Sequence, residues 1–232
     1  MSERPAFADV RAVIFDKDGT LIDIDATWGP AMAKTLIALI PEDGLRQRAA
    51  AEIGVDLRTQ QLLPESAIIA ESNGQICGRL SPLLDRDPAT LLIEFEHYLA
   101  HHVPADLISL DGAHDVLTTL RSAGVWLGLA TNDGEASARQ QLDQLGWLGL
   151  FDSVLGYDSG FGEKPAPGMV LESMARATAG PEDTIMVGDS DTDLEAAHRA
   201  GCRSVLVHSA GGAISPTVSL NRLTELLPLV GM

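Results

Sequence analysis

The second half of the sequence alternates short apolar runs with longer segments of helical pattern. The apolar runs lie at residues 125–130, 153–155, 184–187 and 204–207, and the helical segments at 135–145, 167–179 and 191–200. Strands that alternate with helices of this length form right-handed βαβ units and a parallel sheet covered by helices on both faces. The apolar run at residues 10–15 then opens the same sheet. We therefore predict an α/β fold with a Rossmann-like parallel sheet as its core.

A long helical insert follows the first predicted strand. Residues 31–40, 45–53 and 88–101 have helical patterns, and no convincing strand lies between them. A segment of this length is too large for a crossover loop and indicates an inserted, all-helical domain. Pro104 and the pair Asp111-Gly112 mark the return to the sheet. We expect the α/β core to comprise residues 1–21 and 107–232, and the helical domain residues 22–106.

Two carboxylates follow the first apolar run directly. Asp16 and Asp18 stand two residues apart after a buried strand, and Gly19 and Thr20 come next. A carboxylate near a core is costly unless it has a partner, and a glycine lets the backbone approach a ligand closely. An ordinary acidic turn is the alternative. The pattern favours a site that binds a cation and carries out chemistry.

Three other strand ends carry polar residues at the same relative place, namely Thr131 with Asn132, Lys164, and Asp189 with Asp193. Because the carboxyl ends of parallel strands meet along one edge, these groups should converge with Asp16 and Asp18. Each close pair of carboxylates costs about 4 kcal/mol at an effective dielectric constant of about 20. A hard divalent cation with oxygen ligands removes that cost, and Mg²⁺ suits a site that also binds phosphate.

These residue types can perform the steps of phosphoryl transfer. One carboxylate can attack phosphorus and form an aspartyl-phosphate, while a second protonates the leaving oxygen and later accepts a proton from water. A hydroxyl donor and a cation must hold the phosphate oxygens, which Thr131 and Lys164 can do. Two structural alternatives stay open. Thr131 could cap the helix that begins near residue 135, and Asp189 to Asp193 could form an acidic helix start.

The four segments together resemble the motifs of the haloacid dehalogenase (HAD) superfamily, which includes the phosphoglycolate phosphatases. Asp16-Lys17-Asp18-Gly19-Thr20 is similar to the first motif, Thr131-Asn132 to the second, Lys164-Pro165 to the third, and Gly188 to Asp193 to the fourth. The resemblance spans residues 10 to 212. It implies a HAD fold whose helical insert is a cap of the C1 type.

The resemblance also implies a role for each matching residue. Asp16 would be the nucleophile and Asp18 the general acid and base. Thr131 and Lys164 would hold the substrate phosphate together with Asn132. Mg²⁺ would be bound by Asp16, by the main-chain carbonyl of Asp18 and by Asp189, with support from Asp193.

Two positions depart from the pattern of the superfamily. Lys17 stands where relatives usually have an apolar residue, and Asp133 stands where a lysine is common. Lys17 either alters the local field or points to solvent, and Asp133 removes a cation from the rim of the site. Both departures leave the identity of the substrate open.

Composition limits the partners and the compartment. The net charge of −17 and the pI near 4.5 oppose binding to nucleic acids and to anionic membranes. No apolar run approaches the length of a membrane span, and no export signal begins the sequence. We expect a cytoplasmic protein, monomeric or homodimeric, whose partner is a small phosphorylated metabolite.

Cysteines and histidines offer no second metal site in the sequence. Cys77 and Cys202 lie far apart and indicate buried, reduced thiols. His97 and His101 stand one helical turn apart, but no third ligand is placed near them in the sequence, so an ordinary helix surface is expected.

The function predicted from these features is a Mg²⁺-dependent phosphatase that hydrolyses a small, phosphoglycolate-like monoester through an aspartyl-phosphate. The nearest alternative is a phosphomutase of the β-phosphoglucomutase kind, which uses the same intermediate. A metal-independent dehalogenase and a non-catalytic module that binds a phosphorylated ligand are further alternatives.

Overall fold

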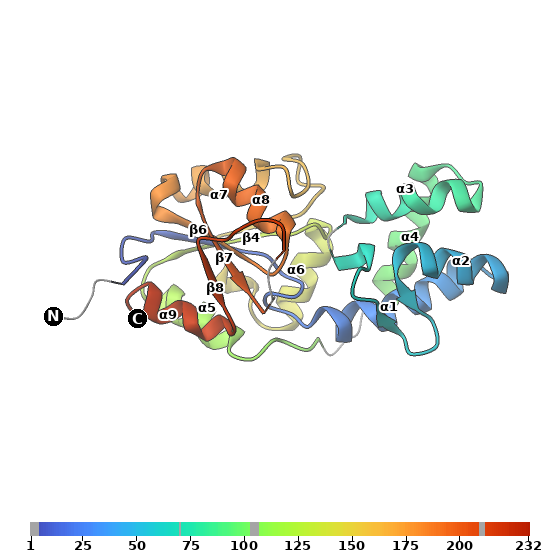
Figure 1. Cartoon of the computed structure of the whole chain (residues 1–232), viewed down its shortest axis with the longest axis horizontal. Helices are drawn as coiled ribbons and strands as arrows, with labels where there is room; N and C mark the ends of the chain where they lie inside the picture. The colour runs from blue at the N-terminus through green and yellow to red at the C-terminus, as the bar shows by residue number, and fades with distance from the viewer. Residues whose placement is uncertain (1–4, 70, 103–106, 209–211) are drawn as a thin grey trace. The chain divides into compact units, whose positions relative to one another are not determined.

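The structure, a computed structural model, describes residues 5–69, 71–102, 107–208 and 212–232. The chain divides into two compact units (Figure 1). The core unit comprises Met1–Ile22 and Ser109–Met232, and the helical unit comprises Asp23–Ile108. Pro104, which the sequence suggested as a marker of the return to the sheet, lies outside the described residues.

The core unit is built on a six-stranded parallel sheet in the order β5-β4-β1-β6-β7-β8. The strands are β1 (Ala12–Phe15), β4 (Trp126–Ala130), β5 (Ser153–Leu155), β6 (Thr184–Gly188), β7 (Arg203–Val207) and β8 (Val218–Leu220). Strand β1 pairs with β4 on one side and with β6 on the other, and Phe15 lies opposite both Leu129 and Val187. The predicted α/β class with a parallel sheet is confirmed.

Helices cover both faces of this sheet, as the alternation of side chains along β1 requires. The helices of the core unit are α5 (Ala113–Ser122), α6 (Glu135–Gln144), α7 (Gly168–Ala177), α8 (Asp191–Ala200), α9 (Leu226–Leu229) and the 3₁₀ turns Leu148–Leu150, Pro181–Asp183 and Leu223–Glu225. Val13 and Phe15 belong to one apolar cluster, to which α5 and α6 contribute, whereas Ile14 belongs to a second cluster with residues of α7 and α8. In Figure 1, α7 and α8 lie on one side of the sheet, and α5 and α9 on the other.

The helical unit has its own apolar core, formed mainly by four helices. They are α1 (Ile24–Leu39), α2 (Asp43–Ile53), α3 (Asn73–Leu84) and α4 (Pro88–His102), and a 3₁₀ turn spans Ala67–Ile69. Helix α4 packs against both α1 and α3. Among the described residues, no helix combines the length and the apolar character needed to cross a membrane.

Two details of the helical unit differ from the sequence analysis, and the first corrects the expectation of an insert without strands. Strands β2 (Val55–Asp56) and β3 (Gln61–Leu62) form an antiparallel ribbon. Each strand is two residues long, which is too short to give an alternating pattern in the sequence. The side chain of Asp56 stabilises the turn between them, because it accepts hydrogen bonds from the amides of Arg58 and Thr59 at 2.8 and 3.0 Å.

Helix α3 is the second correction, since the sequence pattern did not predict it. Glycines at positions 74 and 78 and a proline at position 82 weaken its helical pattern. A capping box between Ser72 and Gln75 supports its start, and this was the available sequence signal.

Candidate active site

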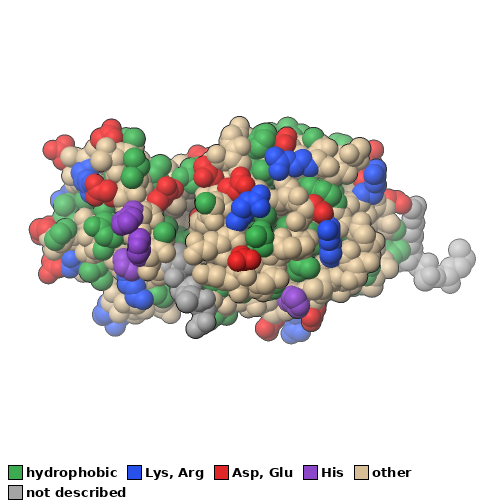
Figure 2. All heavy atoms as spheres, turned by 180° about the vertical axis from the view of Figure 1, so that it is seen from behind, with side chains coloured by type: hydrophobic (Ala, Val, Ile, Leu, Met, Phe, Trp, Pro, Cys, Tyr) green, Lys and Arg blue, Asp and Glu red, His purple; other side chains and the backbone are tan. Residues whose placement is uncertain are grey.

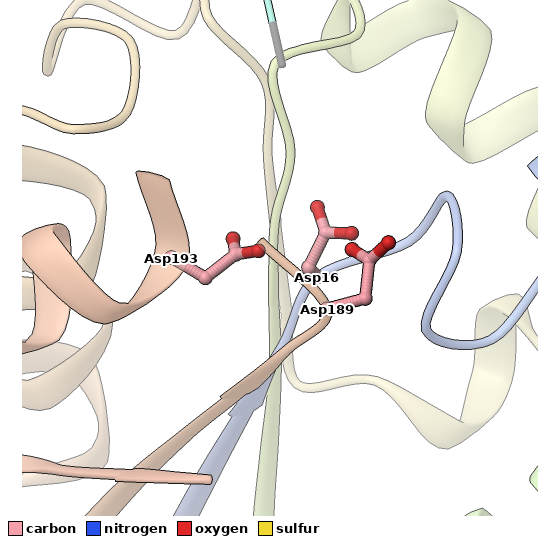
Figure 3. A group of neighbouring side chains, drawn as sticks. All are labelled: Asp16, Asp189 and Asp193. Atoms are coloured by element: carbon pink, nitrogen blue, oxygen red, sulfur yellow. The ribbon is translucent and has the colours of Figure 1, made fainter. Parts of the chain in front are cut away.

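Three aspartates meet at the carboxyl edge of the sheet. Asp16 follows β1, Asp189 follows the neighbouring strand β6, and Asp193 lies in the first turn of α8. One carboxylate oxygen of each lies within 4.8 Å of the others, and Figure 3 shows Asp16 and Asp189 side by side. The pairing of β1 with β6 brings these residues together. The Asp16 amide continues the pairing by one further hydrogen bond, which it donates to the Val187 carbonyl at 2.8 Å. We refer to the three residues as the carboxylate group.

Burial and mutual repulsion disfavour the charged forms of two members of this group, Asp16 and Asp189. Burial, together with the neighbouring carboxylates, raises the pKa of Asp16 to about 7 despite the opposing effect of Lys164. Burial, followed by the charges of Asp16 and Asp193, raises the pKa of Asp189 to about 8. A hard divalent cation among these oxygens would reverse both effects. The donor set, which consists of carboxylate oxygens with no sulfur or imidazole, fits Mg²⁺.

Lys164 supplies the positive charge that the structure places beside the carboxylate group. Its Nζ lies 2.5 Å from Asp16 Oδ1 and 2.7 Å from Asp193 Oδ1, and its side chain is only 3% exposed. Burial opposes the charge of Lys164, but the two carboxylates outweigh it and raise the pKa of the ammonium group. Lys164 is therefore charged and is held at the point where an anionic ligand of Asp16 would be neutralised.

The side chain of Asn132 holds the main chain of Lys164. Its Nδ2 donates to the Lys164 carbonyl at 2.9 Å, and its Oδ1 accepts from the Lys164 amide at 2.8 Å. This pair of bonds ties the end of β4 to the loop that carries the lysine. The predicted contact of Asn132 with substrate stays a prediction.

Thr131 occupies the end of β4, where its amide donates to Leu155 at 3.0 Å. Its buried Oγ1 accepts from the Asp133 amide at 3.1 Å. Gly134 is the N-cap residue of α6 and provides no side-chain bond, so Thr131 does not cap that helix. The helix-start alternative for Asp193 is correct in part, because Asp193 accepts from the Ser190 amide at 3.2 Å and also belongs to the carboxylate group.

Asp18 lies outside the carboxylate group and pairs with its neighbour. The Nζ of Lys17 lies 2.7 Å from Asp18 Oδ2, 3.2 Å from Asp133 Oδ2 and 2.6 Å from the Gln141 Oε1 that accepts its hydrogen bond. The Lys17 side chain is 0% exposed. The alternative that Lys17 points to solvent is therefore wrong, and Asp133 is buried with it rather than placed on a rim. The predicted role of the Asp18 carbonyl in metal binding stays a prediction.

Sequence reasoning missed Gln141 and Ser190. Ser190 Oγ donates to Asp193 Oδ2 at 2.6 Å, so it fixes one member of the carboxylate group. Its position between Asp189 and Asp193, directly before a helix, was a usable capping signal. Gln141 offers no comparable signal, because it lies in the middle of α6 and far from Lys17 in the sequence.

The two histidines of α4 that lie one turn apart belong to the helical unit, whereas the carboxylate group belongs to the core unit. His101 Nδ1 donates to the His97 carbonyl at 2.6 Å, and the two rings lie 4.6 Å apart. Figure 2 shows histidine side chains gathered at the surface. Among the described residues, the carboxylate group is the one cluster with three side chains that could hold a metal ion.

The family model of the haloacid dehalogenase-like hydrolases matches residues 13–207. That span covers most of the chain and includes all the motif residues. The chain belongs to this family. The prediction of an enzyme of the HAD superfamily is therefore confirmed.

Curated relatives of this HAD hydrolase include phosphoglycolate phosphatases. The chain is 30% identical to that of Shigella boydii serotype 4 (strain Sb227) over 244 aligned positions, which cover 97% of this chain and 94% of the relative. The prediction that the enzyme resembles the phosphoglycolate phosphatases is confirmed.

Solved structures share the fold of this HAD hydrolase. CbbY from Rhodobacter sphaeroides, in complex with phosphate, superposes with a TM-score of 0.72 and 18% identity over 96% of this chain and 100% of that one. The HAD-hydrolase structure of YfnB from Bacillus subtilis, bound to magnesium, gives a TM-score of 0.65 and 21% identity over 96% and 99% of the two chains. At these identities the likeness shows the fold.

Proposed function

We propose that this HAD hydrolase is a Mg²⁺-dependent phosphatase that hydrolyses a small phosphate monoester through an aspartyl-phosphate on Asp16. The observation that carries the proposal is the contact of Asp16 with Lys164 at 2.5 Å, beside two further carboxylates. The Asp16 carboxylate, the Lys164 ammonium group and two further carboxylates thus lie together at the carboxyl edge of the sheet. Phosphoryl transfer depends mainly on such positioning and charge neutralisation.

Each residue then has a defined task. The Asp16 carboxylate attacks phosphorus, and the bond to the ester oxygen breaks as Asp18 donates a proton to the departing alcohol. Asp18 next accepts a proton from the water that attacks the aspartyl-phosphate, which releases inorganic phosphate and restores the Asp16 carboxylate. Lys164 and Thr131 hold the phosphate oxygens throughout. Mg²⁺, held by Asp16, Asp189 and the Asp18 carbonyl with Asp193 in support, would supply positive charge that offsets the anionic ligands.

The substrate proposed is a small metabolite of the phosphoglycolate kind. The support is the name of the curated relatives, which match nearly the full length of the chain. Selection of the leaving group is assigned to the helical unit acting as the cap domain, and the enzyme is proposed to work in the cytoplasm.

The test is phosphate release from a panel of monoesters with Mg²⁺, run with wild type and with Asp16→Asn. We expect hydrolysis of phosphoglycolate by the wild type and a loss of at least about 10³-fold in the variant. Asp143→Asn removes an exposed carboxylate of the same unit and serves as the matched control, with unchanged activity.

Other outcomes of this test would identify the rival functions. Formation of a sugar-phosphate isomer in place of inorganic phosphate would identify a phosphomutase. Activity that survives EDTA and needs a haloacid would identify a dehalogenase. Undiminished hydrolysis by folded Asp16→Asn would refute the proposed nucleophile.

A further inference from the structure

Lys17 is a buried ammonium group that the chemistry proposed above does not use. Its Nζ contacts Asp18 Oδ2, Asp133 Oδ2 and Gln141 Oε1 at 2.7, 3.2 and 2.6 Å, and its side chain is fully buried. A charge without solvent must be paired and hydrogen-bonded, or it strongly destabilises the fold. These contacts meet that requirement with groups from the end of β1, the end of β4 and helix α6.

Asp133 is itself fixed by several donors, so it can serve as an anchor. Its Oδ1 accepts from the Gly134 amide at 2.7 Å, and its Oδ2 accepts from Ser137 Oγ at 2.9 Å and from Gln141 Nε2 at 3.3 Å. The amide of Gln141 therefore faces both members of the pair, donating to Asp133 and accepting from Lys17. This arrangement leaves the ammonium group little freedom to move.

Asp18 is the partner of Lys17 that remains partly exposed. Its side chain is 15% exposed, compared with 6% for Asp133 and 0% for Lys17. The network therefore has a buried end at Asp133, which side chains of α6 hold, and a partly exposed end at Asp18. An ion pair with a fixed lysine limits the positions that such a carboxylate can take.

We propose that Lys17 is a positioning residue that orients the carboxyl group of Asp18 toward the leaving oxygen, with Asp133 and Gln141 as its anchors. This inference rests on the proposed function, because it takes Asp18 as the general acid. The ammonium group of Lys17 contacts Asp18, Asp133 and Gln141, and no contact with the phosphate is assigned to it. Its effect on the reaction passes through the placement of one carboxyl group.

The dependence of the rate on the leaving group separates this role from a merely structural one. An alkyl phosphate such as phosphoglycolate needs a well-placed proton donor, because its alkoxide is a poor leaving group. p-Nitrophenyl phosphate releases a stable phenolate and needs that donor far less. Misplacement of Asp18 should therefore slow the alkyl ester selectively, whereas a general loss of folded enzyme would slow both esters equally.

The experiment measures kcat/KM for phosphoglycolate and for p-nitrophenyl phosphate with wild type, Asp18→Asn and Lys17→Met. For Asp18→Asn we expect a loss of about 10²-fold or more with the alkyl ester and a much smaller loss with the aryl ester. Lys17→Met should show the same selectivity, with a loss of about tenfold or more for the alkyl ester and less than about threefold for the aryl ester. Arg121→Met, which removes an ion pair of the same unit with Asp152, is the control and should leave both values unchanged.

A double variant tests the proposal even if Lys17→Met fails to fold. Lys17→Met leaves the buried carboxylate of Asp133 and the partly exposed one of Asp18 without their cation. Lys17→Met/Asp133→Asn, which also removes the charge of the anchor, is therefore measured beside it. The double variant should fold and retain the selective loss.

Equal losses with both esters, or no loss, in a folded variant would overturn the positioning role. If Asp18→Asn shows the selective loss and the Lys17 variants do not, the inference alone fails. If Asp16→Asn remains active, the proposed function fails with it.

Discussion

Substitution of Gly19 by alanine tests how tightly the first motif is packed against the carboxylate group. Gly19 has φ +83°, and a Cβ there would lie 2.1 Å from Asp189 Oδ2. Ordinary contacts begin at 3.4 Å, so the carboxylate must move by about 1.3 Å. Gly124 has the similar φ of +81°, but a Cβ there meets nothing within 4 Å. The two substitutions thus share the backbone strain and differ in the clash.

The strain and the clash affect different quantities. A left-handed alanine costs about 1–2 kcal/mol, so Gly124→Ala should lose about that much unfolding free energy in urea and Gly19→Ala at least as much. Metal ligands must keep their distances to within about 0.2 Å, and displaced support of a ligand weakens metal binding by about 10–100-fold. Gly19→Ala should therefore lose at least about tenfold in Mg²⁺ affinity, while Gly124→Ala should bind Mg²⁺ as the wild type does.

Isothermal titration with Mg²⁺ measures this affinity directly, and the Mg²⁺ dependence of phosphate release provides a second measurement. Both use variants that remain folded by circular dichroism. Equal Mg²⁺ affinity in the Gly19 and Gly124 variants would refute the assignment of Asp189 as a ligand of the cation.

Two further predictions concern charge and loop position. Because burial raises the pKa of Asp16 to about 7 and of Asp189 to about 8, from 3.8, the metal-free folded state binds more protons than the unfolded state between pH about 4 and 8. The contribution of these groups to stability therefore falls as pH rises through that window, and Mg²⁺ should raise the melting temperature more at pH 8 than at pH 5.5. Equal shifts in a thermal melt would contradict this. Asn132→Ala removes both hydrogen bonds to the Lys164 main chain. It should lower the unfolding free energy measured in urea by about 1–3 kcal/mol and should also lower kcat/KM. An unchanged kcat/KM would contradict the view that Asn132 positions the loop that carries Lys164.

The parallel sheet could be predicted from sequence because buried parallel strands are continuous apolar runs. The order of the strands could not, since nothing in a run of valines and leucines specifies its neighbour. That order matters for the site. Asp16 and Asp189 meet because β1 lies next to β6, while Thr131 follows β4 on the other side of β1. The structure brings Asp16, Asp189 and Asp193 together with Lys164, as the motifs predicted, whereas a contact of Thr131 with them stays a prediction.

Lys17 and Asp133 show why the remaining part of the site could not be predicted from the sequence. A single charged side chain is normally exposed to solvent. The sequence analysis therefore expected Lys17 to point to solvent or to alter the local field, and it placed Asp133 at the rim of the site. Burial becomes acceptable only when the partners arrive together, and Gln141 is 124 residues from Lys17 along the chain. Such a pairing is a property of the folded sheet edge and leaves no periodic or local pattern in the sequence.

The two buried ammonium groups also explain why one part of this edge calls for a cation and the other does not. With all carboxylates ionised, Asp16, Asp189 and Asp193 around Lys164 keep two net negative charges, which one divalent ion would neutralise. Asp18 and Asp133 around Lys17 keep a single net charge, and the amide of Gln141 contacts both Lys17 and Asp133. Since the cost of close like charges rises steeply in a buried site, a divalent cation at this edge would be favoured most among Asp16, Asp189 and Asp193. The smaller net charge around Lys17 is compatible with the proton-transfer role proposed for Asp18.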